Sequence, residues 1–158
     1  FNFNILINSL MEVYMNLINQ QKLIDLCNIL KYLYVVVPII LGIDKFTNIL
    51  VNWENYLNPY VTDILNISPR IFMNVVGVIE IIAGTIVFFN TRLGAYLVAA
   101  WLIFIVINLV STGNYLDIAV RDFILSITAL CLAKLTEIRE SELIDTNIKA
   151  ETYHSQKI

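Results

Sequence analysis

The sequence predicts an all-α fold, namely a four-helix transmembrane bundle with an N-terminal amphipathic interfacial helix and a short external helix between the first two spans. Hydrophobic residues make up 58% of the 158 residues, whereas about 45–50% is usual in soluble globular domains. Apolar runs that are long enough to cross a hydrocarbon core of about 30 Å recur between short polar segments. This composition and spacing predict one compact membrane domain followed by a short tail.

Residues 1–22 are interpreted as the amphipathic segment. Leu6, Leu10 and Tyr14 recur at helical spacing on one side, while Glu12 lies on another. Such a helix is expected to lie in the membrane interface and not to cross the bilayer. The segment also lacks the basic start and the small-residue cleavage site of a signal peptide.

The transmembrane domain is predicted to cover residues 23–136, with spans at about 26–50, 69–89, 92–110 and 118–136. Asn58-Pro59 and Ser68-Pro69 each have the pattern of an N-cap followed by proline at the first helical position. A short helix should therefore start at the first pair and the second span at the second pair. The short turn at 90–91 makes the second and third spans antiparallel neighbours.

Residues at the membrane surfaces predict how this domain sits in the bilayer. Trp53, Tyr56 and Tyr60 lie in the connection after the first span and fit an interfacial aromatic belt. Four spans place both termini on one side of the membrane. That side contains seven Lys and Arg residues: Lys22, Lys31, Arg92, Lys134, Arg139, Lys149 and Lys157. The other side contains three: Lys45, Arg70 and Arg121. Because basic residues favour the cytoplasmic side, both termini, including a polar tail at 137–158, are predicted to be cytoplasmic.

Glu80 is the central polar residue of the predicted bundle. It lies in the apolar run at 71–89, where a charge is costly and should face protein or a water-filled cavity. Gly77 and Gly84 lie on the same helix face and would let a neighbouring helix approach closely. The third span offers a second small-residue surface for helix packing, formed by Gly94, Ala95 and Ala99.

Each of the other three spans is expected to bring polar groups to the same outer half of the bundle. The candidates are Asp44, Lys45, Asn108, Arg121 and Asp122. Two interpretations stand out, and a proton path is a weaker third, because a single intramembrane carboxylate gives it little specificity. In the first, Arg121 or Lys45 neutralises Glu80 in a buried structural network that fixes the helix register. In the second, the carboxylate and a cation hold the polar head group of a ligand, and apolar walls hold its lipid-like tail.

The composition argues against several other kinds of site. The net charge of −3, without a basic cluster, leaves no electrostatic footprint for nucleic acid. The single histidine, His154, lies in the polar tail, so neither a bis-histidine haem nor a histidine-rich metal site is expected. Cys27 and Cys131 form no CxxC pair, which argues against thiol-disulfide chemistry. No metal or covalently bound cofactor is expected, and a bound ligand would be a quinone or a lipid.

Four short motifs carry a family resemblance. They are Leu-Gly-Ile-Asp-Lys-Phe at 41–46, Gly-Val-Ile-Glu-Ile-Ile-Ala-Gly at 77–84, Thr-Arg-Leu-Gly-Ala at 91–95 and Ala-Val-Arg-Asp at 119–122. In these motifs the chain resembles the DoxX-like family of small four-helix integral membrane proteins over about residues 30–136. The resemblance implies a bundle in the bacterial inner membrane, linked with quinone-dependent oxidation or with partner redox proteins. It supplies no catalytic residue, and the chain lacks the periplasmic cysteine pairs of the redox-active relatives.

These observations predict a small integral membrane subunit or accessory protein of a larger, redox-associated membrane complex, without a prosthetic group of its own. The alternative is a quinone- or lipid-binding membrane oxidoreductase subunit that uses the polar cluster around Glu80. A transporter is disfavoured, because one four-helix bundle offers little room for a pathway unless it oligomerises. The chain is not expected to be an enzyme by itself. Its expected partners are membrane lipids together with other membrane subunits or further copies of the chain.

Overall fold

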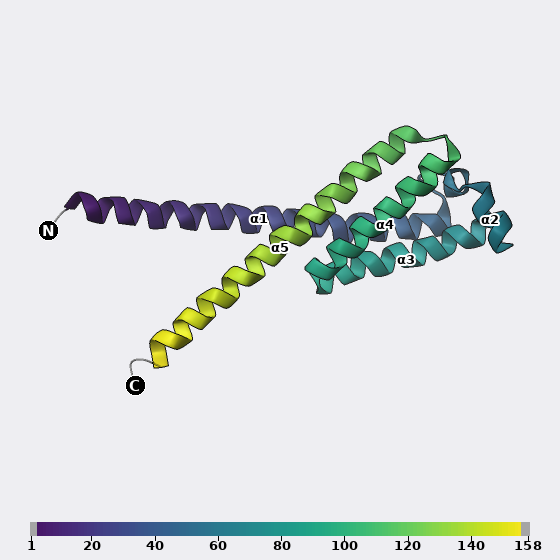
Figure 1. Cartoon of the computed structure of the whole chain (residues 1–158). Helices are drawn as coiled ribbons and strands as arrows, with labels where there is room; N and C mark the ends of the chain where they lie inside the picture. Colours follow the sequence, from purple (N-terminus) through teal and green to yellow (C-terminus); the bar gives the residue numbers. More distant parts are fainter. Residues whose placement is uncertain (1–2, 156–158) are drawn as a thin grey trace.

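The computed structural model describes residues 3–155, and all the regular elements in that range are helices (Figure 1). In chain order they are α1 (Phe3–Thr47), the 3₁₀ helix η1 (Trp53–Tyr56), α2 (Pro59–Leu65), α3 (Pro69–Phe89), α4 (Thr91–Thr112) and α5 (Leu116–Ser155). The predicted all-α class is therefore confirmed. The ends of the predicted N-terminal segment and polar tail, residues 1–2 and 156–158, lie outside the described range.

Three of these helices are long and apolar enough to cross a membrane. They are α1 over Met11–Thr47, α3 and α4. Helix α5 contains an apolar run at 123–133 in its first half, and this run is flanked by Arg121 and Asp122 on one side and by Lys134 on the other. Composition and length thus indicate a membrane protein with at least three helices of spanning character in the described part of the chain.

Two helices are longer than the sequence pattern predicts. Helix α1 continues without a break across the expected boundary near residue 22, and α5 continues through the expected polar tail to Ser155. Neither stretch contains a glycine or proline where the boundary was placed, so nothing in the backbone chemistry stops the helix there. The change from apolar to polar composition marks a change of surroundings and not the end of a helix.

The two helix starts predicted from Asn58-Pro59 and Ser68-Pro69 are present: α2 begins at Pro59 and α3 at Pro69. The Asn58 side chain accepts a hydrogen bond from the Tyr60 amide at 3.1 Å, and Pro59 is the first residue of α2. The Ser68 side chain accepts from the Ile71 amide at 3.4 Å at the start of α3. These side chains satisfy backbone donors that a helix start leaves without intrahelical partners.

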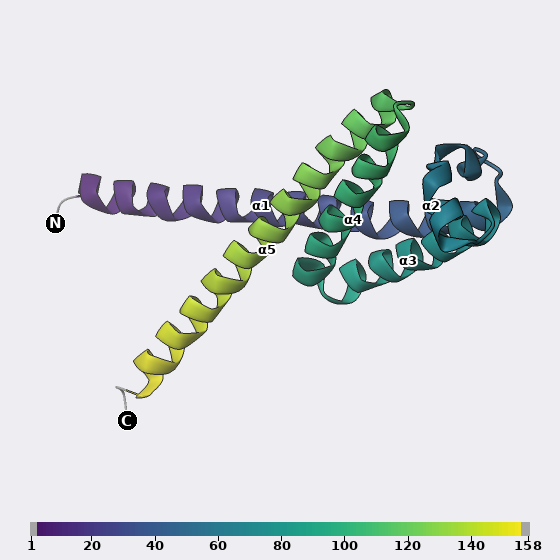
Figure 2. The same cartoon turned by 45° about the vertical axis from the view of Figure 1, so that its right-hand side comes forward.

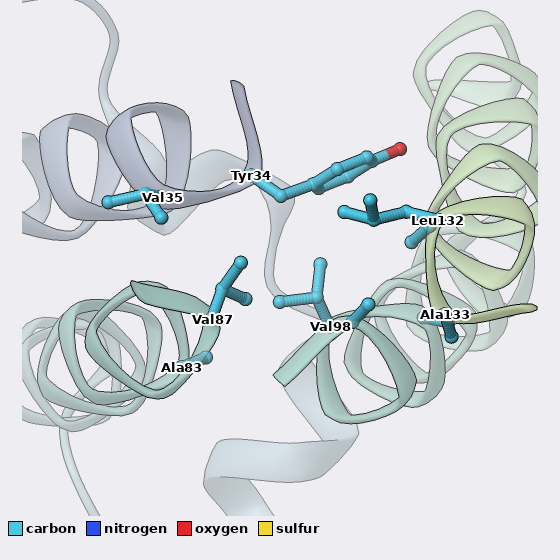
Figure 3. Packing of buried hydrophobic residues seen from close by; sticks show 10 residues of the cluster. Tyr34, Val35, Ala83, Val87, Val98, Leu132 and Ala133 are labelled. Carbon is cyan, nitrogen blue, oxygen red and sulfur yellow. The ribbon is translucent and has the colours of Figure 1, made fainter. Parts of the chain in front are cut away.

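The four long helices pack as two pairs. Helix α1 lies along α3, α4 lies along α5, and α3 and α4 join the pairs through their short connection (Figures 1 and 2). Tyr34, Val87, Val98 and Leu132, one from each long helix, meet at the centre of the main buried cluster (Figure 3). The Tyr34 hydroxyl also donates to the Leu125 carbonyl oxygen at 2.6 Å, which ties α1 to α5 across this cluster. The cluster fixes how the two pairs sit against each other.

Candidate functional site

The crossing of α1 and α3 is very close at Gly42 and Gly77. A Cβ atom on Gly42 would lie 2.7 Å from the Gly77 carbonyl oxygen, and one on Gly77 would lie 2.6 Å from the Gly42 carbonyl oxygen. Both distances are shorter than real Cβ contacts, so the approach requires glycine on both helices. The sequence pointed to Gly77 as a packing residue but did not identify Gly42 as its partner.

The other predicted packing residues lie at further helix contacts. A Cβ on Gly84 would lie 2.8 Å from the Val35 carbonyl oxygen of α1, and Gly94 packs against the backbone of Val87. Ala95 and Ala99 are buried in the main core. Small side chains therefore occur where helices approach one another, which matters in a bilayer because lipid tails are as apolar as the helix surfaces and close packing must stabilise association.

Glu80 pairs with Lys45 and not with Arg121. The Lys45 ammonium nitrogen Nζ lies 2.6 Å from Glu80 Oε2, and the two side chains are only 5% and 9% exposed. Each residue lies three positions after a crossing glycine, on helices that run in opposite directions. Because helical side chains lean toward the N-terminus of their own helix, the two long side chains extend toward each other across the crossing.

Trp53 covers the other side of the Lys45 ammonium group. Its ring centroid lies 3.8 Å from Lys45 Nζ, a distance at which the ring face attracts the cation. The indole nitrogen Nε1 donates a hydrogen bond of 2.7 Å to Asp44 Oδ2. Trp53 was interpreted from the sequence as an interfacial residue, and its contact with Lys45 was missed. Only its position soon after the Asp44-Lys45 pair could have suggested it.

Asp44 organises the chain that follows α1. Its Oδ1 accepts hydrogen bonds from the amides of Ile49 and Leu50 at 3.0 and 3.1 Å, while Oδ2 accepts from Trp53. Asp44 is 5% exposed. The carboxylate therefore satisfies backbone donors beyond the helix end and holds Trp53 over the ammonium group. It does not touch Glu80, so its contribution to the cluster is positional.

Asn108 holds the connection between α1 and α3 against α4. Its side-chain nitrogen donates to the Tyr56 carbonyl oxygen at 3.0 Å, and its side-chain oxygen accepts from the Asn58 amide at 3.4 Å. The Asn58 side chain in turn donates to the Ser111 hydroxyl at 2.8 Å. These bonds place η1 and the start of α2 over the end of α4.

Asp122 and Arg121 differ sharply in burial. Asp122 is 8% exposed, whereas the Arg121 side chain is 67% exposed. Arg121 Nε lies 3.4 Å from Asp122 Oδ1, which makes a loose contact between sequence neighbours. The structure thus separates the two predicted cations: Lys45 is buried in the ion pair, and Arg121 lies mostly outside.

A cavity of about 590 Å³ lies beside this cluster, and Asp44 is not part of its lining. Its walls come from all four long helices and from the connection between α1 and α3, and they are mostly apolar and aromatic. The charged and amide side chains in the lining belong to Lys45, Glu80, Asn108, Arg121 and Asp122. A volume of this size falls within the range of about 300–1,000 Å³ that is typical of small-molecule sites. An apolar wall with a few convergent polar groups suits an amphiphilic molecule.

No group of three or more His, Cys, Asp and Glu side chains in the described range is arranged to hold a metal ion. The two cysteines are free: Cys27 is buried and Cys131 is exposed. The contacts that the cluster itself makes are charge pairing and hydrogen bonding. Searches against protein-family models, curated proteins and solved structures found no match to this chain.

Proposed function

We propose that this chain is a small integral membrane protein that holds an amphiphilic membrane molecule, of lipid or quinone class, in the cavity beside the Lys45–Glu80 pair. The polar head group would face the charged side chains, and the apolar tail would lie along the walls that α1, α3 and α4 contribute. The function is binding, with no prosthetic group bound by the chain itself.

The membrane placement in this proposal has four spanning helices. Three are long and apolar enough by composition, and we assign the fourth span to about residues 118–136 of α5. Two observations support this assignment. Helix α5 packs along α4, and its residues Ala129, Leu132 and Ala133 are fully buried in the shared core. The excess of Lys and Arg at the end that holds both termini supports a cytoplasmic location of that end.

The resemblance to the DoxX-like family enters this proposal as further support. The motifs at 41–46 and 77–84 contain both partners of the buried ion pair and both glycines of the helix crossing. If the resemblance holds, the membrane is the bacterial inner membrane and the function is linked with quinone-dependent oxidation. Residues of both motifs, among them Lys45 and Glu80, then form one wall of the cavity.

The single observation that carries the proposal is a buried ion pair in the wall of a largely apolar cavity. Two charges inside a bundle are costly to desolvate, and their attraction offsets this cost only when the geometry is good. A short contact that is also covered by an aromatic ring meets this condition. An ion pair that only fixed the helix register would not need a cavity of about 590 Å³ beside it.

The test is to identify the molecule that stays bound to the chain in a membrane-like environment. We expect native mass spectrometry of the protein, released from nanodiscs of bacterial lipid, to show one amphiphile bound per chain. The Glu80→Gln variant should lose that ligand, whereas Glu54→Gln, which changes a partly exposed carboxylate outside the cavity, should retain it. A well-folded parent chain that carries no amphiphile in excess of empty nanodiscs would refute the proposal.

A second candidate is an accessory subunit of a larger, redox-associated membrane complex. The first part of α1 and the last part of α5 extend beyond the packed bundle (Figures 1 and 2). In that part of α1, the exposed apolar side chains include Met11, Val13, Met15 and Leu17. A partner helix or a second copy of the chain could cover them. Stable co-purification of a partner that is lost when Val13 and Leu17 are changed to Ser would favour this candidate.

A further inference from the structure

The charges buried around the cavity do not cancel. Lys45, Glu80 and Asp122 all line it, with side chains that are 5%, 9% and 12% exposed. Two carboxylates therefore share the buried space with one ammonium group. Lys45 donates its short hydrogen bond to Glu80 at 2.6 Å and lies against the ring of Trp53, so Asp122 interacts only with its charge at longer range.

Arg121 compensates Asp122 only weakly. Its Nε is 3.4 Å from Asp122 Oδ1, and two thirds of its side chain is exposed. Exposed ion pairs contribute little, because water screens them and the long side chain loses freedom when it is held. Asp122 is thus a nearly buried carboxylate in a cavity wall, with its counter-charge mostly outside.

A carboxylate in this setting selects the chemistry of the head group. A positive head group beside Asp122 favours the ionised form of its carboxylate, because an opposite charge nearby offsets the cost of burial. The ionised form only accepts hydrogen bonds, so a head group that offers acceptors alone gains nothing from it. An anionic head group would be repelled. An ammonium group supplies three donors and the missing positive charge, and hydrogen bonds between charged partners are about twice as strong as neutral ones.

We propose that the cavity binds an amphiphile with an ammonium head group, which donates hydrogen bonds to Asp122 while the tail lies along the apolar walls. This inference rests on the proposed function, and it narrows the ligand from lipids and quinones in general to amines with a long chain. The amine can belong to a free long-chain amine or to the ethanolamine group of a phospholipid.

Three probes with one C18 chain test the head group. Oleylamine, oleyl alcohol and oleate differ in charge but share the tail, so their binding to the nanodisc-embedded chain can be compared by native mass spectrometry. We expect oleylamine to bind most tightly and oleate most weakly. Asp122→Asn should weaken oleylamine binding by about tenfold or more, because it removes a charged hydrogen bond, and should change oleyl alcohol binding much less.

Two further variants test whether the loss of binding is specific to the Asp122 carboxylate or follows from any loss of charge on α5. Asp117→Asn removes a carboxylate from the first turn of the same helix but outside the cavity, and it should leave oleylamine binding unchanged. Arg121→Gln removes the cation that competes for Asp122 and should strengthen oleylamine binding. Asparagine has nearly the shape of aspartate, so the fold should be retained. A circular dichroism spectrum and an unfolding temperature equal to those of the parent would verify this.

The outcomes distinguish the two proposals. Oleylamine binding that is insensitive to Asp122→Asn, or no tighter than oleyl alcohol binding, overturns the ammonium inference and leaves the proposed function intact. A folded parent chain that binds none of the three probes overturns both. Lysophosphatidylethanolamine and lysophosphatidylglycerol with the same chain then identify the source of the amine. Binding of the first alone, with the same dependence on Asp122, assigns it to a phospholipid.

Discussion

Lys45 Nζ lies 2.6 Å from Glu80 Oε2, although the two residues are 35 positions apart and belong to different helices. The contact depends on the Gly42–Gly77 crossing, which brings the two backbones close, and on the opposite directions of α1 and α3. Because each side chain leans toward the N-terminus of its own helix, the pair forms between the two helices. This relationship links helix packing to the charge in the cavity wall.

Glu80→Gln should destabilise the fold, because it leaves the buried Lys45 without its counter-charge in contact. Breaking a buried ion pair from one side costs roughly 3–5 kcal/mol. The free energy of unfolding can be measured in nanodiscs, with Glu54→Gln as the matched control, because the Arg70–Glu54 pair is partly exposed. The double variant Lys45→Met, Glu80→Gln should recover most of the loss. A single variant as stable as the parent would show that water or ligand satisfies Lys45.

Trp53→Phe should loosen the connection after α1 while keeping an aromatic ring over Lys45. It removes the 2.7 Å hydrogen bond to Asp44, and a hydrogen bond to a charged group contributes about 1.5–3 kcal/mol. Cleavage of the connection by a protease should therefore become faster. Tyr60→Phe, at a side chain that is largely exposed, is the control. Equal cleavage rates for Trp53→Phe and the parent would contradict this prediction.

Gly77→Ala should separate α1 from α3, because its new Cβ would lie 2.6 Å from the Gly42 carbonyl oxygen. Overpacking of this kind typically costs about 1–3 kcal/mol. The displaced helix should also weaken the Lys45–Glu80 ion pair. Glu80→Gln should therefore lower the free energy of unfolding by less in the Gly77→Ala background than in the parent. Val75→Ala, at an exposed position of the same helix, should have a small effect. Additive losses would show that the crossing and the ion pair are independent.

The sequence predicted α3 closely because its signals are local. Ser68 and Pro69 define the start, and Asn90 ends the helix and caps the next one, so the bounds follow from residues adjacent in the chain. The membrane spans predicted within α1 and α5 are shorter than these helices for the opposite reason. They rested on a change in polarity, which reports the surroundings of a helix and does not by itself end it.

The partner of Glu80 could not be chosen from the sequence. In a four-helix bundle of unknown packing, the side chains of Lys45 and Arg121 could both reach Glu80. The way in which α1 packs against α3 places Lys45 next to it. Trp53 was missed because an aromatic residue near the membrane surface already has an ordinary explanation. Gly42 was missed as a packing residue for a related reason: one glycine in an apolar run shows its purpose only when the opposite backbone is known.

Protonation of Glu137 should lower the stability of the fold as the pH falls. Glu137 lies just beyond the fourth span assigned above. The hydrogen bond from Lys134 at 2.9 Å, with further support from Tyr96 and Arg92, lowers the pKa of the Glu137 carboxyl. A group with a lowered folded pKa stabilises the fold above its unfolded pKa of about 4.3, and this contribution is lost as the pH falls through the folded value. Glu137→Gln should reduce the change in unfolding temperature between about pH 5 and pH 3, and Tyr96→Phe should reduce it less. An unaltered pH dependence in Glu137→Gln would contradict the assignment.

The number of spans decides where the two ends of the bundle lie, and α5 is the helix on which it depends. With four spans, α2 lies outside and the end of α5 lies in the cytoplasm. If α5 did not cross, because of its charges at Arg121, Asp122 and Lys134, both would lie on the same side.

Two cysteine substitutions on exposed residues separate these cases in a Cys27→Ser, Cys131→Ser background. Asp63→Cys in α2 should react with a membrane-impermeant maleimide added outside intact cells, and Ser141→Cys in α5 should react only after lysis. A reporter fused after Ile158 should likewise be active only in the cytoplasm. Labelling of both cysteines from outside would remove α5 from the membrane. It would then also remove one wall from the cavity in which Asp122 is proposed to bind.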